Sequence, residues 1–379
     1  SFSTGYNGPG NITIRGGVFD GRVKVGLYRN SCFIGISHAS NVLIENVTFQ
    51  NGYASHLLEI NSSRDVTVRN CTFKNLNDAN LQNREFINID HSFGSGYPAH
   101  GAYDGTPCLN VTVENCSFSN GSDGVGTHSD PGGNKHVNIK VLNNRFSNLS
   151  AHAITPRYWR DSLISGNTVD GSLTAVRISP SGETITVSDN VFANVGNFEN
   201  SAIYVNNANG CMFTNNTITP RPTNVYTEAI VVSGTSRNTY ISTPGITDGA
   251  RDGKIRIYNS ALPSTVNNVT TVYLENGTKQ SIPFNTSAKQ GIVTIACRSG
   301  AQNSPRGIYW VRCSNTTEMF IEKISSVQYQ DNVVLDKGIP AVGDVAAGKF
   351  AVYAGSDGCI HLVNKTGDAR TIDLSIVGN

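Results

Sequence analysis

A seven-residue motif is repeated along the N-terminal half of the chain and constrains the fold more than any other feature. We call this motif the phrase. Its copies read ENVTFQN, RNCTFKN, ENCSFSN and LNNRFSN and begin at residues 45, 69, 114 and 142. The aromatic position of the phrase recurs as Phe49, Phe73, Phe118, Phe146, Val169, Phe192 and Ile218. Successive positions are 23 to 28 residues apart, except for one interval of 45. This period, with short β-rich runs and no helical periodicity, predicts a parallel β-solenoid whose turns stack like residues on like.

Asparagine occupies two further positions of the repeat. One lies three residues before the aromatic position, at Asn46, Asn70, Asn115, Asn143 and Asn215, with Asp189 in the same place. The other lies two residues after it, at Asn51, Asn75, Asn120, Asn148 and Asn194. Amides at equivalent positions of stacked turns can bond one another, and asparagine tolerates the left-handed backbone of a bend. We therefore expect asparagine ladders at two bends of each turn, with Cys71 and Cys116 among the stacked interior residues.

Composition excludes several classes of partner. Charged residues make up 15% of the 379-residue chain and its net charge is +1, so no basic surface for nucleic acid is expected. No apolar run approaches the roughly 18 residues of a membrane span, which argues against membrane insertion. The eight cysteines are too sparse for a disulfide framework and match no zinc pattern, which predicts free thiols. Because the chain begins at Ser1 without a methionine, we expect a fragment or processed product that lacks an N-terminal attachment domain.

The repeat ends near residue 243, where a stretch rich in glycine, proline and charge begins. The segments beyond it alternate apolar and polar residues in the manner of antiparallel strands. The expected fold class is all-β, with a parallel β-helix and its substrate groove over residues 1–245. An antiparallel β-sandwich is expected over 246–337, and a β-meander over 338–379 that caps the coil or contacts other subunits.

Residues 8 to 243 resemble the right-handed, single-stranded parallel β-helix proteins of the pectin-lyase-like superfamily. The strings HLLEI, FINIDH, AYDGTPCLNVTVENC, GVGTHS and HAITPRYW are similar to those of bacteriophage tailspike and appendage proteins. This resemblance implies a homotrimer in a virion tail, made in the bacterial cytoplasm and acting on the surface of the host cell. It also implies that the ligand is a capsular polysaccharide or a wall teichoic acid, which such proteins often depolymerise.

A second strand in each turn gives two columns of outward residues, because alternate residues of a strand face opposite sides. The first column is Glu59, Asn88, Gly126, Thr155, Arg177, Tyr204 and Val231. The second is Asn61, Asp90, His128, Arg157, Ser179, Asn206 and Ser233. With strands about 4.8 Å apart and about 3.3 Å per residue, Glu59 and Asp90 are expected to lie roughly 8 Å apart. That separation suits the carboxyl pair of an inverting glycosidase.

The chain leaves the coil between Asp90 and Asn110 as a loop rich in glycine and aromatics, beside these columns. Long loops of repeat proteins cluster on the binding face, so we expect Asp104 to point into the groove. Tyr97 and Tyr103 are expected to form sugar-stacking walls. Asp104 could instead cap an Asp-Gly turn, Asp90 could cap its own loop or pair with Arg157, and His128 could be a satisfied turn histidine.

These considerations give a set of candidate site residues. The predicted catalytic residues are Glu59, Asp90 and Asp104. The predicted substrate-binding residues are His56, Asn88, His128, His152, Arg157, Trp159, Arg177, Tyr204 and Tyr103. Glu59 or Asp104 would protonate the leaving oxygen and Asp90 would activate water, while Arg157 and His128 would hold anionic groups. No metal ion or other cofactor is expected.

The predicted function is therefore recognition of a bacterial surface glycopolymer, with its depolymerisation by an endo-acting glycoside hydrolase. Two alternatives remain open at this point. One is a receptor-binding spike or adhesin in which the same groove binds without turnover. The other is a polysaccharide lyase, for which Arg157 and Arg177 would neutralise a uronate carboxylate.

Overall fold

The computed structural model describes residues 3–21, 32–53, 55–77, 84–93, 101–196, 201–221, 228–242, 245–246, 255–257, 264–266, 269–283, 290–297, 306–313, 319–325, 333–356 and 359–377. The chain forms two compact units. The first consists of Ser1–Val231 with Thr243–Ile255, and the second of Val232–Ser242 with Arg256–Asn379.

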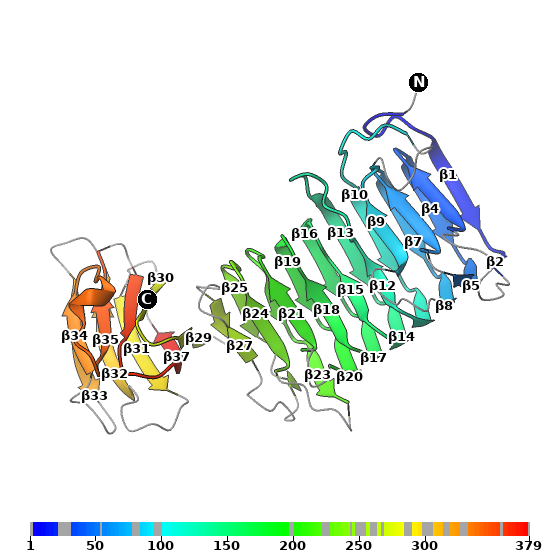
Figure 1. Ribbon diagram of the computed structural model, residues 1–379. Helices are drawn as coiled ribbons and strands as arrows, with labels where there is room; N and C mark the ends of the chain where they lie inside the picture. Colours follow the sequence, from blue (N-terminus) through cyan, green and yellow to red (C-terminus); the bar gives the residue numbers. More distant parts are fainter. Residues whose placement is uncertain are drawn as a thin grey trace. The chain divides into compact units, whose positions relative to one another are not determined.

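The first unit is a coil in which each turn adds one strand to each of three parallel sheets (Figure 1). Sheet A holds β1 (Gly10–Arg15), β4 (Ser40–Glu45), β7 (Arg64–Arg69), β10 (Leu109–Glu114), β13 (His136–Leu142), β16 (Trp159–Ser165), β19 (Glu183–Ser188) and β22 (Met212–Thr214). Sheet B holds β2 (Val18–Asp20), β5 (Thr48–Tyr53), β8 (Thr72–Asn77), β11 (Ser117–Gly121), β14 (Arg145–Leu149), β17 (Thr168–Ser172), β20 (Val191–Val195) and β23 (Thr217–Pro220). Sheet C holds β3 (Ile34–Ser37), β6 (Leu58–Asn61), β9 (Glu85–Asp90), β12 (Asp123–Gly126), β15 (His152–Thr155), β18 (Thr174–Ile178) and β21 (Ile203–Asn206). The short strands β24 (Ile230–Ser233), β25 (Thr239–Ser242), β26 (Gly245–Ile246) and β27 (Ile255–Ile257) follow in the sequence.

The aromatic position of the repeat sets the register of sheet B, as predicted. Phe49 pairs with Phe73, and Phe73 with Phe118, on neighbouring strands. The stack continues through Phe146 to Val169. The phenyl rings of Phe49 and Phe73 lie parallel with centroids 4.7 Å apart, and each of these side chains is fully buried. The 45-residue interval is therefore a single turn with an insertion between β9 and β10, and the solenoid prediction is confirmed.

Both predicted asparagine positions adopt the left-handed backbone conformation, at φ of about 52° to 58°. The series that follows the aromatic position forms a side-chain ladder on sheet B. Its amides donate along the coil from Asn120 to Asn75, from Asn75 to Asn51 and from Asn51 to Asp20. In the series that precedes the aromatic position, Asn215 donates to Asp189 at 3.3 Å. These bends need left-handed residues, because the chain must change direction between sheets within one or two residues.

A second, fully buried ladder was not predicted. It lies two residues before the aromatic position and consists of Cys71, Cys116, Asn144, Asn167, Asn190 and Asn216. The amide oxygens of Asn167, Asn190 and Asn216 each accept from the backbone and side chain of the residue one turn earlier, as Asn167 does from Asn144 at 2.9 and 3.1 Å. The amide nitrogen of Asn167 donates to the carbonyl of Val141. The ladder therefore supplies hydrogen-bond partners inside the coil, where backbone groups at a bend have no strand partner.

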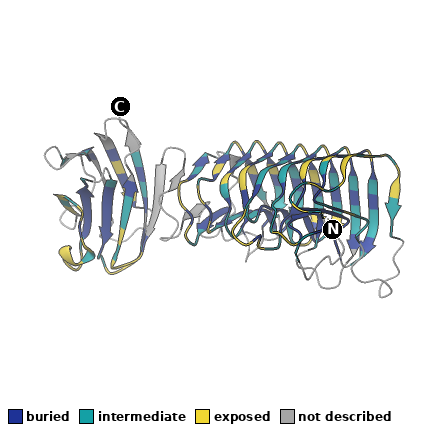
Figure 2. Cartoon of the chain, turned by 90° about the horizontal axis from the view of Figure 1, so that it is seen from above, coloured by how far each residue is buried: buried dark blue, intermediate teal, exposed yellow. Residues whose placement is uncertain are grey.

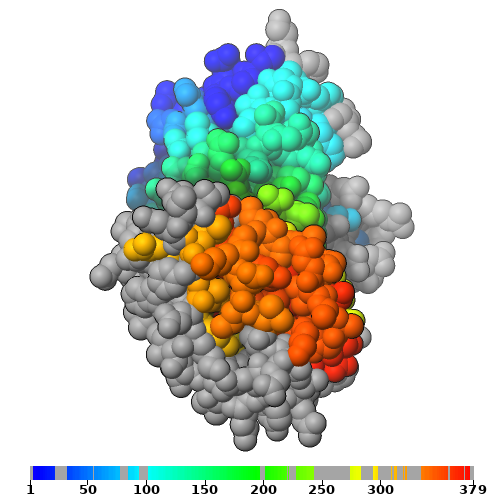
Figure 3. All heavy atoms as spheres, turned by 90° about the vertical axis from the view of Figure 1, so that its left-hand side faces the viewer, coloured from blue at the N-terminus to red at the C-terminus, as the bar shows by residue number. Residues whose placement is uncertain are grey.

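The second unit contains two further sheets. One has the order β28 (Ser264–Val266), β29 (Val269–Leu274), β37 (Arg370–Val377), β31 (Gln290–Cys297), β32 (Arg306–Arg312) and β33 (Phe320–Ser325). The other has the order β30 (Thr278–Pro283), β36 (Cys359–Asn364), β35 (Phe350–Ala354) and β34 (Val333–Lys337), with the 3-10 helix η2 (Val342–Asp344) after β34. Figure 3 shows the segment after residue 333 in orange and red. Because β37 lies between β29 and β31, the predicted segments 246–337 and 338–379 share their sheets.

Candidate functional site

Sheet C carries the first of the predicted columns in the expected register. Glu59 pairs with Asn88, Asn88 with Gly126, and Gly126 with Thr155. On the turn after Thr155, Arg177 of β18 pairs with Tyr204 of β21. The second column begins as predicted, with Asn61 beside Asp90. Alternate residues such as Leu58, Ile60 and Ile87 fill the core of the coil, so the column residues lie on the opposite face of the sheet.

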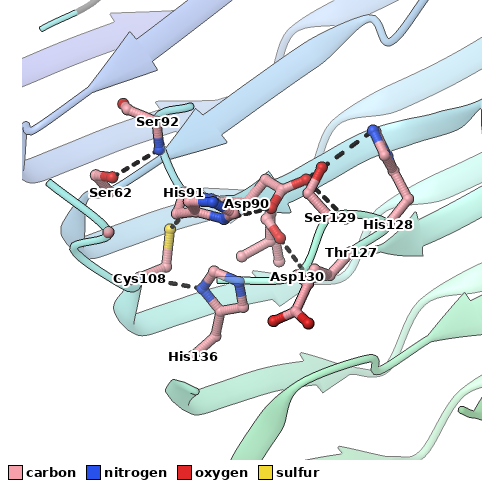
Figure 4. A network of polar contacts seen from close by, with 12 residues as sticks. Ser62, Asp90, His91, Ser92, Cys108, Thr127, His128, Ser129, Asp130 and His136 are labelled. Carbon is pink, nitrogen blue, oxygen red and sulfur yellow. Dashed lines mark hydrogen bonds and ion pairs between the residues drawn. The ribbon is translucent and has the colours of Figure 1, made fainter. Parts of the chain in front are cut away.

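The expectation that the two carboxylates of this strip face solvent is wrong. Glu59 is 1% exposed and Asp90 is 0% exposed, and β6 and β9 are buried along their whole lengths. Figure 2 shows how buried and exposed residues are distributed over the chain. Glu59 accepts a hydrogen bond from the side-chain amide of Asn88 at 3.0 Å. Asp90 accepts from the backbone of His91 at 3.0 Å and of Ser129 at 3.2 Å, so it caps the loops that follow β9 and β12 (Figure 4). Strand alternation predicts the face of a side chain but not whether other parts of the chain cover that face.

A third column of polar residues lies along sheet C, three residues before the first-column residue of each turn. It contains His56, Glu85, Asp123, His152, Thr174, Ser201 and Glu228. Glu85 and Asp123 were not predicted, although they are register partners on β9 and β12. In each turn two consecutive buried residues follow, such as Phe86 and Ile87, and this doublet interrupts the alternation. The doublet is the sequence signal that would have placed Glu85 and Asp123 on the same face as Glu59.

Two histidines and three carboxylates form a buried cluster on this face. The Oε2 atom of Glu85 lies 3.3 Å from Nδ1 of His56 and 3.3 Å from Nδ1 of His128. The Nε2 atom of His56 lies 3.4 Å from Oε1 of Glu59. The Nε2 atom of His128 lies 4.0 Å from Oδ2 of Asp90. Glu59 and Asp90, predicted as a direct catalytic pair, are therefore linked through His56, Glu85 and His128.

The charges of the cluster shift its pKa values. Burial raises the pKa of the Asp90 carboxyl, but the hydrogen bond from His91 and the positive charge of His128 outweigh it and leave the pKa below its ordinary value. Burial also raises the pKa of the Glu85 carboxyl, but the hydrogen bond from His128 outweighs it and leaves the pKa below its ordinary value. Burial lowers the pKa of His128, yet its bond to Glu85 leaves that pKa above the ordinary value. The cluster therefore favours ionised Glu85 and Asp90 and a charged His128.

The next residues of the third column behave differently. Burial, together with the charge of Glu85, raises the pKa of the Asp123 carboxyl to about 7. Asp123 accepts hydrogen bonds from the backbone of His152 at 3.1 Å and from the hydroxyl of Ser122 at 2.8 Å. Burial and the charges of Arg177 and Arg157 lower the pKa of His152 to about 4. His152 is therefore neutral at physiological pH and accepts a hydrogen bond from Arg177 at 3.2 Å.

Two half-buried arginines follow the buried cluster along the coil. The guanidinium of Arg177 lies over the ring of Tyr204, 5.5 Å from its centroid. Burial and the charge of Arg157 lower the pKa of Arg177. Arg157 follows β15, which pairs with the strand β18 that carries Arg177. Neither arginine forms an ion pair with any residue that the structure describes, and the predicted pair of Arg157 with Asp90 is not formed. The Nε atoms of both are buried without a hydrogen-bond partner among the described residues. We call Arg157, Arg177 and Tyr204 the arginine surface.

The other predicted site residues lie elsewhere. Trp159 is 0% exposed on β16 of sheet A, where its indole donates to Thr127 at 2.8 Å, so the expectation that it contacts substrate is wrong for this conformation. Asp104 accepts from the backbone of Gly5 at 2.8 Å and of Thr106 at 3.0 Å. It therefore caps its turn rather than joining Glu59 and Asp90. Tyr103 is 47% exposed. Tyr97 lies outside the described residues.

Comparison with known proteins agrees with this architecture. Residues 77–244 match the family described as "Right handed beta helix region". The coil is a right-handed parallel β-helix. The chain is 30% identical over 181 residues to the plasmin and fibronectin-binding protein A of Streptococcus pneumoniae, a match that covers 44% of this chain and 25% of that protein. The chain thus spans about a quarter of the length of this relative.

The chain is also similar to solved structures. The crystal structure of PfbA, a surface adhesin of Streptococcus pneumoniae, matches with a TM-score of 0.55 at 17% identity and covers 86% of this chain and 81% of that one. A tailspike protein mutant of E. coli bacteriophage HK620, in complex with a hexasaccharide, matches with a TM-score of 0.42 at 14% identity. That match covers 98% of this chain and 75% of the tailspike chain. Within the described residues, no helix has the length and hydropathy that a membrane span requires.

Proposed function

We propose that this β-helix protein binds an anionic glycopolymer of a bacterial surface, such as a wall teichoic acid or an acidic capsular polysaccharide. The observation that carries the proposal is the arginine surface, in which two half-buried arginines of neighbouring turns lack a carboxylate partner among the described residues. A half-buried cation without a counter-ion is costly, and a phosphate or uronate group would supply the missing charge. Arginine presents donors that match both groups.

The surroundings of Arg177 prepare it for such a ligand. Its guanidinium packs on Tyr204 and donates to the neutral ring of His152, which together restrict its orientation. Restricting a side chain before binding lowers the entropy lost when the ligand arrives. Because the β-helix places Arg157 and Arg177 on neighbouring turns, a polymer lying along the coil would meet both with successive charged units.

The relatives support a role at a surface. One relative is named for binding plasmin and fibronectin, and a similar structure is described as a surface adhesin. Both descriptions fit a chain whose β-helix binds a ligand without turning it over. A position at a bacterial or phage surface, and the homotrimer expected from the tailspike resemblance, belong to this proposal.

Binding to purified polymers tests the proposal. The protein is titrated with teichoic acid, an acidic capsular polysaccharide and neutral dextran, and the affinities are compared for the wild type, Arg177→Gln and Arg157→Gln. Losing one charged hydrogen-bonding group is expected to weaken binding of the anionic polymer about tenfold or more. Raising the salt concentration should weaken wild-type binding for the same reason.

Arg145→Gln is the matched control, because Arg145 is exposed on β14 of sheet B, away from the arginine surface. This variant should bind like the wild type. Equal binding of dextran and the anionic polymers, or unchanged affinity in both arginine variants, would contradict the proposal.

Cleavage of the bound polymer is a second candidate function. It is favoured by Asp123, whose carboxyl group accepts from the backbone of His152, the residue whose ring accepts from Arg177. Asp123, Glu59 and Asp90 are all buried, so cleavage through any of them would require the site to open. Polymer length in the same incubations separates the functions, since a hydrolase shortens the chains, a lyase also creates unsaturated ends, and an adhesin leaves length unchanged. Shortening that persists in Asp123→Asn would exclude Asp123 as the acid.

A further inference from the structure

We propose that His56, Glu85 and His128 form a binding site for a divalent transition-metal ion, with Zn²⁺ as the ion that their chemistry fits best. Two imidazoles and one carboxylate are a known ligand set for zinc with an open fourth position. His56 lies just before β6, Glu85 begins β9 and His128 lies just after β12, so the three residues come from three successive turns. The inference does not depend on the proposed function.

The distances within the trio suit a tetrahedral ion. One candidate ligand atom from each residue lies within 4.8 Å of the others. The two contacts from Glu85 Oε2 to the Nδ1 atoms of His56 and His128 are both 3.3 Å. Ligand bonds of about 2.0–2.1 Å at tetrahedral angles put neighbouring ligand atoms about 3.4 Å apart. The same contacts are longer than the roughly 2.7–2.9 Å of a charge-assisted hydrogen bond. The 3.3 Å spacing also suits two ligands of one ion, which would replace the hydrogen bond between His128 and Glu85.

Each histidine also has a second carboxylate at its other ring nitrogen. Nε2 of His56 faces Glu59 at 3.4 Å, and Nε2 of His128 faces Asp90 at 4.0 Å. Metal-bound histidines usually donate their remaining N–H to a carboxylate or carbonyl, which fixes the tautomer and orients the ring. Glu59 and Asp90, buried and far from any role as exposed catalysts, thus have a defined part in this site.

The outer carboxylates are themselves held in place. Asn88 donates to Glu59, and the backbone groups of His91 and Ser129 donate to Asp90 (Figure 4). Figure 4 shows His128 reaching toward Asp90 from the loop that also carries Ser129. This second layer would keep both imidazoles oriented before an ion arrives.

A metal ion also resolves the hydrogen bonding of the two rings. Both rings have carboxylates near both nitrogens, and Nδ1 of His56 also lies 3.0 Å from the backbone carbonyl of Glu85. A neutral imidazole has only one N–H to donate. Protonating both rings would place two cations face to face, with centroids 5.1 Å apart and planes 17° apart. With an ion bound at Nδ1, each neutral ring would donate its single Nε2–H to Glu59 or Asp90. The ion would also offset the charge of the three buried carboxylates, Glu59, Glu85 and Asp90.

Access to the site is through His128. Its side chain is 23% exposed, whereas those of His56 and Glu85 are almost fully buried. An ion could therefore exchange with solvent on one side while binding would join three turns of the coil. A fourth ligand would come from that open side, and water is the ordinary occupant of such a position.

Metal binding by the full chain tests the inference. Protein freed of metal with a chelator is titrated with Co²⁺ and Zn²⁺, and bound metal is counted by elemental analysis. We expect one ion per chain, with the intense visible absorption of tetrahedral Co²⁺ and without the ultraviolet charge-transfer band of a cobalt–thiolate bond. Zn²⁺ should displace Co²⁺ and raise the thermal unfolding midpoint, because an ion that binds only the folded state stabilises it.

Variants separate this site from the cysteines and from surface carboxylates. Glu85→Gln and His128→Gln should abolish the one-to-one binding, while Glu59→Gln should weaken it about 10–100-fold by removing the outer carboxylate. Glu114→Gln, on β10 of sheet A, is the matched control and should bind like the wild type. Circular dichroism checks that each variant folds. If Glu85→Gln does not fold, His128→Gln, which changes a partly exposed residue, still tests the site. Absence of stoichiometric binding by the wild type, a thiolate spectrum, or full binding by folded His128→Gln would overturn the inference.

Discussion

Single asparagines perform two different tasks in this protein. Those at the exposed bends, such as Asn120, adopt a left-handed backbone and form a ladder at the surface. Those of the inner ladder are buried and bond to backbone groups that have no strand partner. Asn167 accepts from the backbone of Asn144 and donates to Val141 and Asn190. The same residue type therefore contributes conformation at one bend and buried hydrogen bonds at the other.

Asn167→Ala should consequently be strongly destabilising. It leaves at least two buried backbone groups without partners, at a cost of about 1–3 kcal/mol each. We expect the free energy of unfolding to fall by about 3 kcal/mol or more, measured by urea denaturation. Asn120→Gly is the control, because glycine keeps the left-handed bend and only an exposed amide is lost. A loss in Asn120→Gly as large as in Asn167→Ala would show that the inner ladder has no special role.

In sheet C, β12 packs closely against the next turn at Gly124, where there is no room for a side chain. A Cβ atom built on Gly124 would lie 2.3 Å from the carbonyl oxygen of Ala153 and 2.6 Å from a ring carbon of Phe146. Both neighbours belong to the next turn, and the carbonyl is backbone, which cannot rotate away. This spacing sets the distance between β12 and β15, and with it the position of Asp123 relative to His152.

Gly124→Ala should therefore push these strands apart. We expect it to lower the free energy of unfolding by about 1–3 kcal/mol, the usual cost of overpacking a core, and to weaken binding at the arginine surface. Gly343→Ala is the control, since a Cβ there meets no atom within 4 Å. Wild-type stability for Gly124→Ala in thermal denaturation would mean that the turns can separate at no cost.

On the scale of the whole molecule, each strand of the β-helix pairs with strands of the neighbouring turns. β10 pairs with β7 on one side and β13 on the other, whereas in the described part of the chain β1 pairs with β4. The residues of β1 are also more exposed than those of β10. A turn held from one side opens at a lower free energy than one held from both.

Hydrogen exchange followed by mass spectrometry tests this gradient. Amides of β10 and β13 should exchange at least about a hundredfold more slowly than those of β1, which corresponds to about 3 kcal/mol in opening free energy. Uniform exchange along the coil would instead show that the β-helix unfolds in one cooperative step. Adding Zn²⁺ should slow exchange in β6 and β9 if the metal site is correct.

The sequence by itself determined the coil. The period of the phrase, the aromatic column and the left-handed asparagines were predictable because stacked turns repeat the same local environment. Equivalent positions of successive turns therefore carry similar residues. Strand alternation also placed Glu59 beside Asn88 and Arg177 beside Tyr204. The signal of the inner ladder was present in Asn144, Asn167 and Asn190 but lay one residue away from the expected position.

Only the tertiary structure decided what surrounds those side chains. Whether a strand face is open or covered depends on segments from other turns, and for that reason Glu59 and Asp90 are buried and Trp159 lies in the core. Ligands gathered from three turns leave no short spacing in the sequence, so the contact of Glu85 with two histidines could not be anticipated. Local repeats fix backbone register, whereas burial and charge pairing arise from residues that the coil brings together across long sequence distances.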